Sequence, residues 1–193
     1  MNLYIIAGCN GAGKTTASET ILPELLNCYE FVNADNIARG ISPFNVEKVA
    51  FEAGRIMLMR IDELLAAQVD FAIETTLSTV SYLGLVRRAQ QMGYHVTLLY
   101  VWLDDIELAK ARVADRVAKG GHNIPPDIIE RRYKKGLLNL FQRFTEAVDF
   151  WLIIDNTHDV LERVAYGEKK FAPTVEHPYL WNQINARLHE YSQ

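Results

Sequence analysis

A glycine-rich segment near the N-terminus has the residue types and the spacing that bind phosphate groups. Residues 8–15 read GCNGAGKT and match the pattern G-x-x-x-x-G-K-[ST] in full. Glycines let the backbone turn so that successive N–H groups point at phosphate oxygens. In this pattern Lys14 reaches the β- and γ-phosphates and acts in catalysis, and the Thr15 hydroxyl binds Mg²⁺. The predicted nucleotide contacts are Gly8, Asn10, Gly11, Ala12, Gly13, Lys14, Thr15 and Thr16. The segment therefore predicts ATP and Mg²⁺ as cofactors.

Acidic residues stand just after short apolar runs that are predicted to be strands, and these strand ends are expected to lie near the glycine-rich segment. In a doubly wound sheet, functional groups lie just beyond the carboxyl ends of the strands. Asp35, in FVNAD, is the candidate base for an acceptor hydroxyl, with a cap for the following turn as the alternative. Glu74, in FAIETT, is the candidate ligand for a Mg²⁺-bound water or a substrate hydroxyl, with Thr75 beside it. The alternative role for Glu74 is that of an acidic residue that stabilises a helix N-terminus. For Asp104 and Asp105 capping is the favoured role.

Basic residues gather in residues 110–135, which hold eight Lys or Arg and three acidic residues, a net charge of +5. Arg112 and Arg116 recur on one face of a predicted helix, and Arg131 and Arg132 follow a Gly-Pro break. An arginine brought to a phosphoryl group in transfer stabilises its charge. We therefore predict catalytic roles for Arg116 and for Arg131 or Arg132, and a substrate contact at Arg112. For Arg116 and for Arg131 or Arg132, a surface salt bridge is the alternative.

These residues need a scaffold in which strands alternate with helices. The strand-like runs are 3–7, 31–33, 71–73, 95–103 and 151–154. The helical patterns are 14–26, 45–68, 80–92, 106–119 and 127–148, with an edge hairpin expected at 168–175 and a terminal helix at 179–191. Alternation of this kind favours right-handed crossovers and a sheet covered on both faces. The predicted fold is α/β: a three-layer α/β/α P-loop NTPase fold with a mainly parallel five-stranded sheet, like the nucleoside monophosphate kinases. One domain is predicted over 1–193, with a helical lid at about 106–148.

Composition narrows the classes of partner. The 193 residues are 49% hydrophobic and 23% charged, typical of one globular core. The net charge of −4 argues against general nucleic-acid affinity. Neither a membrane-spanning run nor a signal peptide is recognisable, so no membrane partner and a cytoplasmic location are expected. Cys9 and Cys28 have no metal-ligand or redox spacing.

Five ordered stretches resemble the zeta-toxin-like P-loop kinases, and more closely their compact stand-alone bacterial relatives described as predicted ATPases or kinases. The stretches, within residues 3–156, are IAGCNGAGKTT, FVNAD, AIETTLS, RVADRV with GGHNIP, and IIDN. The resemblance implies an adenylate-kinase-like sheet order, ATP with Mg²⁺, and a protein antitoxin or regulator as a candidate partner. It implies a base, an acceptor-contacting acid and lid arginines at Asp35, Glu74, Arg116 and Arg131 or Arg132. Toxin members phosphorylate the sugar of UDP-N-acetylglucosamine, which makes a nucleotide sugar a candidate acceptor.

Taken together, the sequence favours an ATP-dependent kinase that moves the γ-phosphate to a hydroxyl of a small molecule. A transporter-type ATPase is disfavoured because the chain has no LSGGQ signature, and a GTPase because it has no NKxD. One alternative is a nucleotide-dependent switch or partner-binding ATPase without a small acceptor. A nucleic-acid 5′-hydroxyl kinase is the other, which the acidic composition disfavours.

Overall fold

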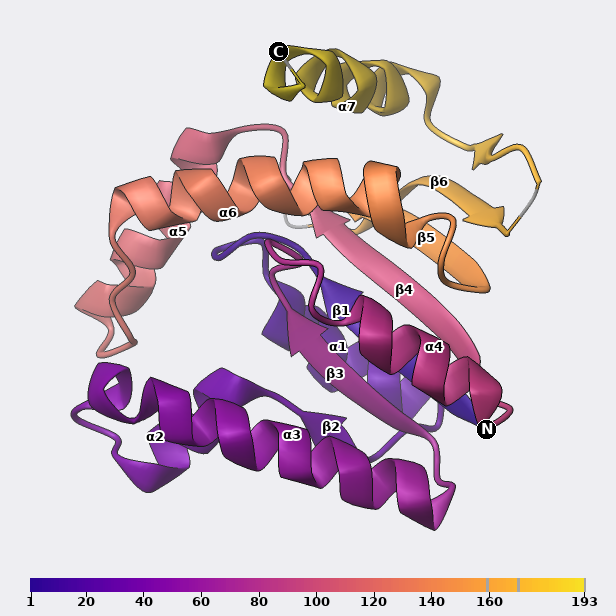
Figure 1. Ribbon diagram of the computed structural model, residues 1–193. Coiled ribbons are helices and arrows are strands. Elements are labelled where there is room, and N and C mark those ends of the chain that lie inside the picture. Colours follow the sequence, from indigo (N-terminus) through magenta and orange to yellow (C-terminus); the bar gives the residue numbers. More distant parts are fainter. Residues whose placement is uncertain (159, 170, 193) are drawn as a thin grey trace.

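The computed structural model describes residues 1–158, 160–169 and 171–192, and within them one sheet lies between two layers of helices (Figure 1). Its strands are β1 (Asn2–Ala7), β2 (Phe31–Val32), β3 (Phe71–Thr75), β4 (His95–Trp102), β5 (Phe150–Asp155), β6 (Glu162–Glu168) and β7 (Thr174–Val175). They are hydrogen-bonded in the order β2-β3-β1-β4-β5-β6-β7. The pairs from β2 to β5 are parallel, whereas β6 and β7 are antiparallel additions. The predicted three-layer α/β/α fold with a mainly parallel sheet is therefore confirmed.

The predicted number of five strands is wrong, since the described residues form a seven-stranded sheet. The hairpin expected at 168–175 begins earlier, because β6 covers Glu162–Glu168 and pairs along the whole of β5. Only Val164, Ala165 and Gly167 of β6 are buried. A strand with so few buried apolar residues gives a weak strand signal in the sequence.

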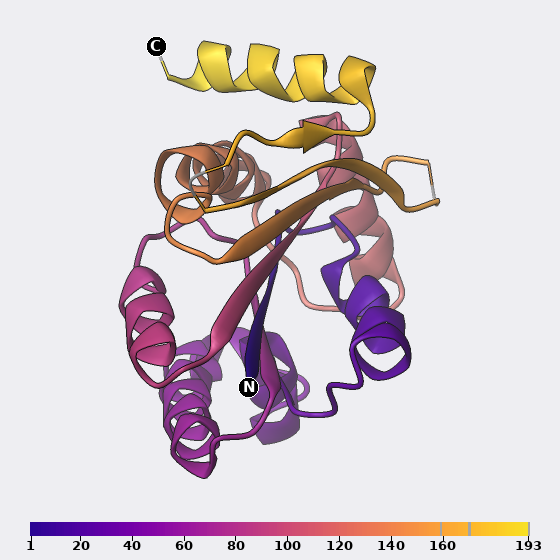
Figure 2. The same cartoon turned by 90° about the vertical axis from the view of Figure 1, so that its right-hand side faces the viewer.

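The helices form two layers, one on each face of the sheet. They are α1 (Lys14–Thr20), α2 (Ala34–Ile41), α3 (Ala50–Ala67), α4 (Leu83–Gln91), α5 (Ile106–Ala118), α6 (Pro126–Asn139) and α7 (Pro178–Tyr191). The short turns η1 (Ile21–Leu25), η2 (Val46–Val49) and η3 (Leu140–Phe144) adjoin α1, α3 and α6. Figure 2 shows α1 and α5 on one face, with α3 and α4 on the other. Among the described residues, no helix has both the length and the apolar character needed to cross a membrane.

Alternation along β1 explains why both faces are covered. Leu3 and Ile5 pack against the helices α3 and α4, whereas Tyr4 and Ile6 pack toward α5. Successive side chains of a strand point to opposite faces, so β1 contributes to two apolar clusters. Burying one such side chain completely stabilises the fold by about 1.5–3 kcal/mol. This strand therefore fixes the position of the glycine-rich segment that follows it.

The helix α2 was not predicted from the sequence. Its N-cap is Asn33, whose Oδ1 accepts hydrogen bonds from the backbone N–H groups of Asp35 (2.8 Å) and Asn36 (3.2 Å). The alternative role of Asp35 as the cap is therefore wrong, because Asn33 takes that position. Asp35 instead lies in the first turn of α2, with its side chain exposed.

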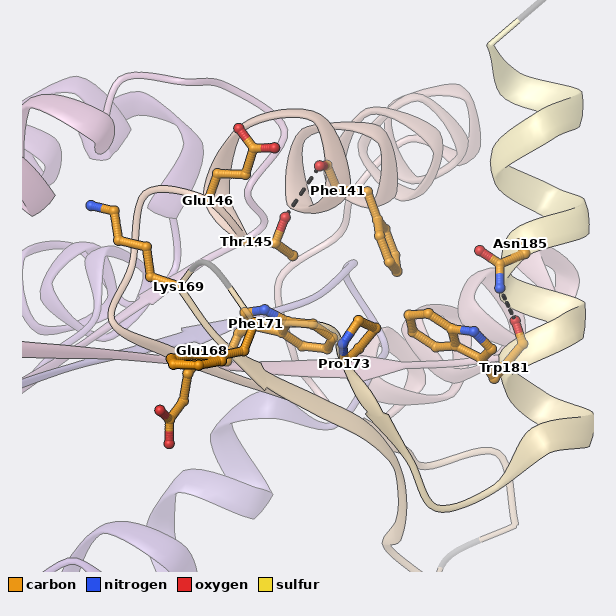
Figure 3. Close-up of a pocket in the computed structure, with 10 residues that line it drawn as sticks. Phe141, Thr145, Glu146, Glu168, Lys169, Phe171, Pro173, Trp181 and Asn185 are labelled. Carbon is orange, nitrogen blue, oxygen red and sulfur yellow. Dashed lines mark hydrogen bonds between the residues drawn. The ribbon is translucent and has the colours of Figure 1, made fainter.

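The C-terminal helix α7 confirms the terminal helix expected at 179–191. It is attached through Trp181, which stacks on Trp151 of β5 with ring centroids 6.3 Å apart and an interplanar angle of 11°. Phe141 of η3 packs against the Trp181 ring, with ring centroids 5.6 Å apart (Figure 3). These rings and Phe171 border a cavity of about 560 Å³. This cavity shares no lining residue with the site described next.

Candidate active site

The glycine-rich segment forms a tight turn between β1 and α1, in the context predicted for a phosphate-binding loop. Gly13 is the N-cap of α1 with φ 86°, and a Cβ there would lie 2.3 Å from the Asn156 side chain. Gly11 has φ 83°, and its Cβ would lie 2.5 Å from the carbonyl oxygen of Ala109 on α5. Only glycine accepts both the positive φ and the close approach. Gly11 and Gly13 thus allow a narrow turn at the N-terminus of α1, where backbone N–H groups can bind an anion.

A cavity of about 190 Å³ lies beside this loop, and functional side chains reach it from four different elements. Lys14 comes from α1, Asp35 from α2, Glu74 from β3 and Arg132 from α6. The short strand β2 brings α2 to the cavity because it pairs with β3, which in turn pairs with β1. The cavity therefore holds a cation at the phosphate loop, a second cation and two carboxylates.

Glu74 is the most connected of these side chains. Its Oε2 accepts hydrogen bonds from the Thr15 hydroxyl and from the Asn33 amide, both at 2.8 Å. Its Oε1 lies 3.6 Å from Nζ of Lys14, and the side chain is only 11% exposed. A buried carboxylate needs partners of this kind to offset its desolvation. The neighbouring Thr75 also borders the cavity and accepts a hydrogen bond from the N–H of Leu77 through Oγ1.

Lys14 is buried, with 6% of its surface exposed. Its Nζ donates a hydrogen bond to the carbonyl oxygen of Cys9 at 2.9 Å and faces Glu74. A lysine rarely lies this deep unless it is paired. Burial raises the pKa of the adjacent Cys9 thiol to about 11, so this cysteine is protonated at neutral pH. The only strong charge that the loop offers to a phosphate is therefore the ammonium group.

Arg131 and Arg132, which the sequence could not separate, lie on different sides of α6. Arg132 borders the cavity, and its Nη1 donates a hydrogen bond to Oδ1 of Asn10 in the loop at 3.0 Å. Burial lowers the pKa of Arg132, and the nearby Asp35 opposes this shift. Arg131 is exposed. Of the two, Arg132 is the arginine that can reach the phosphate loop.

Arg116 does not border the cavity. Its Nη2 donates a hydrogen bond to the backbone oxygen of His122 at 2.9 Å, which closes the turn between α5 and α6. The predicted catalytic role for Arg116 therefore has no support from this arrangement, which instead gives it a part in holding the turn of the helical hairpin.

Arg112 is also outside the cavity and contacts the chain after β5. Its guanidinium donates to the backbone oxygens of Asn156 (2.8 Å) and Thr157 (3.1 Å). Asn156 in turn donates through Nδ2 to the backbone oxygen of Ala12 at 2.8 Å. Arg112 thus supports the phosphate loop from behind, whereas an acceptor contact was predicted. Thr16, a predicted nucleotide contact, is exposed on α1.

Three residues of the site were not chosen from the sequence. Asn33 binds Glu74, Asn156 binds the phosphate loop, and Tyr82 borders the cavity. Asn33 and Asn156 do stand within the stretches FVNAD and IIDN, so a signal existed for both. Asn33 could also have been found as a residue type that caps a helix. Tyr82 carries no sequence signal, because it reaches the cavity only through the placement of α4.

The oxygen atoms of Thr15 and Glu74 fit a magnesium ion. The two side chains are joined by a hydrogen bond of 2.8 Å at the mouth of the phosphate loop. Hydroxyl and carboxylate oxygens are hard ligands, and Mg²⁺ usually combines one or two of them with phosphate oxygens and water. These residues could therefore hold a magnesium ion brought by a nucleotide.

The fold and the site together define a P-loop kinase: a phosphate loop after the first strand of a mainly parallel sheet, one carboxylate on the neighbouring strand β3, another in the first turn of α2, and an arginine on a helical hairpin. The family model of the zeta toxins matches residues 2–163. The chain belongs to the zeta toxin family.

Individual proteins are also similar to this chain. A protein of Haemophilus influenzae is 31% identical over 126 residues, which are 65% of this chain and 88% of that protein. The structure of AvrRxo1-ORF1:-ORF2 with ATP matches with a TM-score of 0.73 and 18% identity and covers 96% of this chain. The match spans 64% of that longer chain. The PezAT toxin-antitoxin system of Streptococcus pneumoniae matches with a TM-score of 0.67 and 16% identity, over 100% of this chain and 87% of the other. At these identities the structural matches support the fold.

Proposed function

We propose that this protein transfers the γ-phosphate of ATP to a hydroxyl group of a small molecule, with nucleotide sugars among the candidate acceptors. The observation that supports this best is the convergence of Lys14, Asp35, Glu74 and Arg132 on one cavity beside the phosphate loop. A switch or partner-binding ATPase does not need a second carboxylate, such as Asp35, across the cavity from the phosphate loop. A kinase needs one there to receive the acceptor.

In the proposed reaction, Asp35 orients the acceptor hydroxyl and takes its proton. The acceptor oxygen attacks the γ-phosphorus, and the bond from that phosphorus to the β–γ bridging oxygen breaks. ADP leaves with the electron pair of that bond, and the proton on Asp35 passes to water. Charge spreads over the phosphoryl oxygens in such a transition state, so a fixed cation there lowers the barrier. Lys14 and Arg132 are the two cations that border the cavity.

Thr15 and Glu74 would hold Mg²⁺ in this scheme. The bound ion would neutralise charge on the β- and γ-phosphates. Glu74 has a second task for the protein itself, because its hydrogen bond to Asn33 keeps the cap of α2 in place. That contact supports the position of Asp35, which lies two residues further on.

The direct test is a transfer screen with ATP and magnesium over free sugars, nucleotide sugars, nucleosides and an RNA oligonucleotide with a 5′-hydroxyl. The products are scored by mass. We expect one small-molecule class to gain a single phosphoryl group at the expense of ATP. ATP hydrolysis without transfer to any acceptor would contradict the proposal and favour the switch ATPase. Transfer to the oligonucleotide alone would favour the nucleic-acid kinase.

Replacement of Arg132 by alanine is expected to lower kcat by about 10²-fold, because the transition state loses a preorganised cation. Arg131→Ala is the matched control, since it removes the same group from the exposed side of the same helix. We expect that control to stay within about threefold of wild type, as is usual for surface charges. Equal losses in both variants, measured by steady-state kinetics, would show that Arg132 acts through helix stability or net charge.

A protein regulator is the remaining partner that we propose. Two structural neighbours are complexes or systems of two components, AvrRxo1-ORF1:-ORF2 and PezAT. An antitoxin-like partner for this chain is expected to slow transfer in the same assay when it is added in stoichiometric amount. A tight complex with undiminished transfer would contradict that role.

A further inference from the structure

A larger cavity lies next to the cavity beside the phosphate loop, which we call the catalytic cavity. It has a volume of about 700 Å³ and runs as a groove between α3 and α4 (the helices below and to the right of the sheet in Figure 1). Ala34, Met57 and Tyr82 border both cavities, so the two lie next to each other. Its size falls in the range of about 300–1,000 Å³ that small-molecule sites have. The catalytic cavity of about 190 Å³ has room for a hydroxyl-bearing end of an acceptor, and the groove has room for its body.

Two helix glycines keep this groove open. Gly54 lies in α3 and Gly84 in α4, and both border the groove. A Cβ at either position would meet no atom of the described residues within 4 Å. Glycine in a helix interior, where Gly54 lies, is destabilising relative to alanine, and neither packing nor a positive φ requires glycine at Gly54 or Gly84. The fold therefore gives no reason for glycine at these two positions, and the open space beside them suggests a role in binding.

The walls of the groove are mainly apolar and partly solvent-exposed. Phe51 is 83% exposed and Leu58 is 58% exposed, both on the face of α3 that borders the groove. The Tyr82 side chain borders both cavities, and among the residues that the structure describes its hydroxyl donates only to the weak acceptor Sδ of Met57, at 3.6 Å. A buried or half-buried tyrosine hydroxyl usually has a better partner. The groove thus offers apolar contact area along its length and one hydroxyl donor at its inner end.

Charge at the rim limits the kind of molecule that fits. Arg88 is paired with Asp62 across the gap between α4 and α3. Arg55 also borders the groove and has no ion-pair partner among the described residues. The remaining charge is therefore positive, which favours a neutral or anionic occupant over a cationic one.

We propose that the phosphate acceptor has an apolar body, an aryl ring or a branched alkyl group, that lies in the groove between α3 and α4 while its hydroxyl reaches Asp35. The inference rests on the proposed kinase function and specifies the acceptor class of that same site. It separates the acceptor from small, fully polar alcohols such as free sugars and glycerol, which would leave the groove unfilled.

The groove is tested first without any transfer reaction. The probe is 8-anilinonaphthalene-1-sulfonate, an aromatic anion whose fluorescence rises in apolar sites. The variants are Gly54→Leu and Gly84→Leu, which fill the groove from either helix. Gly40→Leu is the matched control, since Gly40 is also a helix glycine with open space around its Cβ and borders neither cavity.

We expect saturable binding to wild type and to Gly40→Leu, and binding weakened about tenfold or more in each groove variant, as the loss of roughly one ring's contact area implies. Equal binding to all four proteins would overturn the proposal, and so would the absence of saturable binding to wild type. Thermal unfolding is followed in parallel. If a leucine variant melts well below wild type, Gly54→Ala and Gly84→Ala replace it, since alanine favours the helix.

The second arm adds alcohols with an aryl or branched alkyl body to the transfer screen and uses the acceptor that the extended screen identifies. We expect kcat/KM for that acceptor to fall about tenfold or more in each groove variant and to stay near wild type in Gly40→Leu. Unchanged kcat/KM in the groove variants would overturn the groove assignment and leave the kinase function standing. Failure of every acceptor in the screen would instead contradict the kinase function, while the fluorescence result would still decide whether the groove binds apolar molecules.

Discussion

Replacement of Lys14 by alanine is expected to reduce phosphoryl transfer by at least about 10³-fold, equivalent to about 4 kcal/mol of barrier. Lys14 is the buried cation at the phosphate loop, with Nζ 3.6 Å from Glu74. Its removal takes away the charge that we propose contacts the transferring phosphoryl group, and it leaves the Glu74 carboxylate without the cation 3.6 Å from it. Steady-state transfer at saturating ATP and titration of nucleotide binding measure the two effects.

Lys135→Ala is the control for this prediction, because Lys135 is an exposed lysine of α6 and makes none of these contacts. It is expected to keep the transfer rate of wild type within about threefold. If Lys14→Ala retained more than a tenth of wild-type transfer, the assignment of the phosphate-binding loop would be wrong. Circular dichroism of both variants separates loss of chemistry from loss of fold.

Replacement of Asp35 by asparagine is expected to lower kcat by about 10³-fold, within the range that general-base catalysis contributes, while ATP affinity changes little. The amide keeps the size of the side chain but cannot take the proton of the acceptor. Asp35 is exposed and is not the cap of α2, so the helix should form normally. The prediction is checked by kcat for the acceptor together with calorimetry of magnesium nucleotide binding.

Asp127→Asn serves as the matched control, since Asp127 is also exposed in the first turn of a helix but lies outside the catalytic cavity. Its kcat should equal that of wild type. Full turnover in Asp35→Asn would remove Asp35 as the base. A parallel loss of nucleotide affinity would place the effect on the loop and not on the proton transfer.

Much of the fold could be predicted because its signals are local. The parallel strands β1, β3, β4 and β5 are short apolar runs, and the helices between them have regular spacing of apolar residues. The helix α2 was missed because it has only eight residues and ends close to a proline, although Ala34, Ile37, Ala38 and Ile41 recur at helical spacing. The strand β6 was placed too late because only three of its seven residues are buried, which gives a weak apolar pattern. The position of β6 also depends on its pairing with β5, which the local sequence does not show.

The candidate site could be predicted only where chemistry is encoded in a contiguous motif. The loop from Gly8 to Thr15 is such a motif, and Glu74 ends a strand that pairs with β1. The choice between Arg131 and Arg132 depends on the rotation of α6 about its axis, which tertiary packing sets. The same holds for Arg116, whose side chain turns back to the oxygen of His122. The catalytic roles themselves stay predictions until the variants are measured.

The Glu74 carboxylate connects the part of the site proposed to bind the nucleotide with the part proposed to bind the acceptor. Through Lys14 and Thr15 it contacts the part that would bind the donor, and through Asn33 it contacts the cap of the helix that carries Asp35. A ligand that redistributes these bonds on one side alters the free energy of the arrangement on the other side. Affinities for the nucleotide and for the acceptor are therefore thermodynamically coupled through one residue, and the coupling must have the same size whichever of the two binds first.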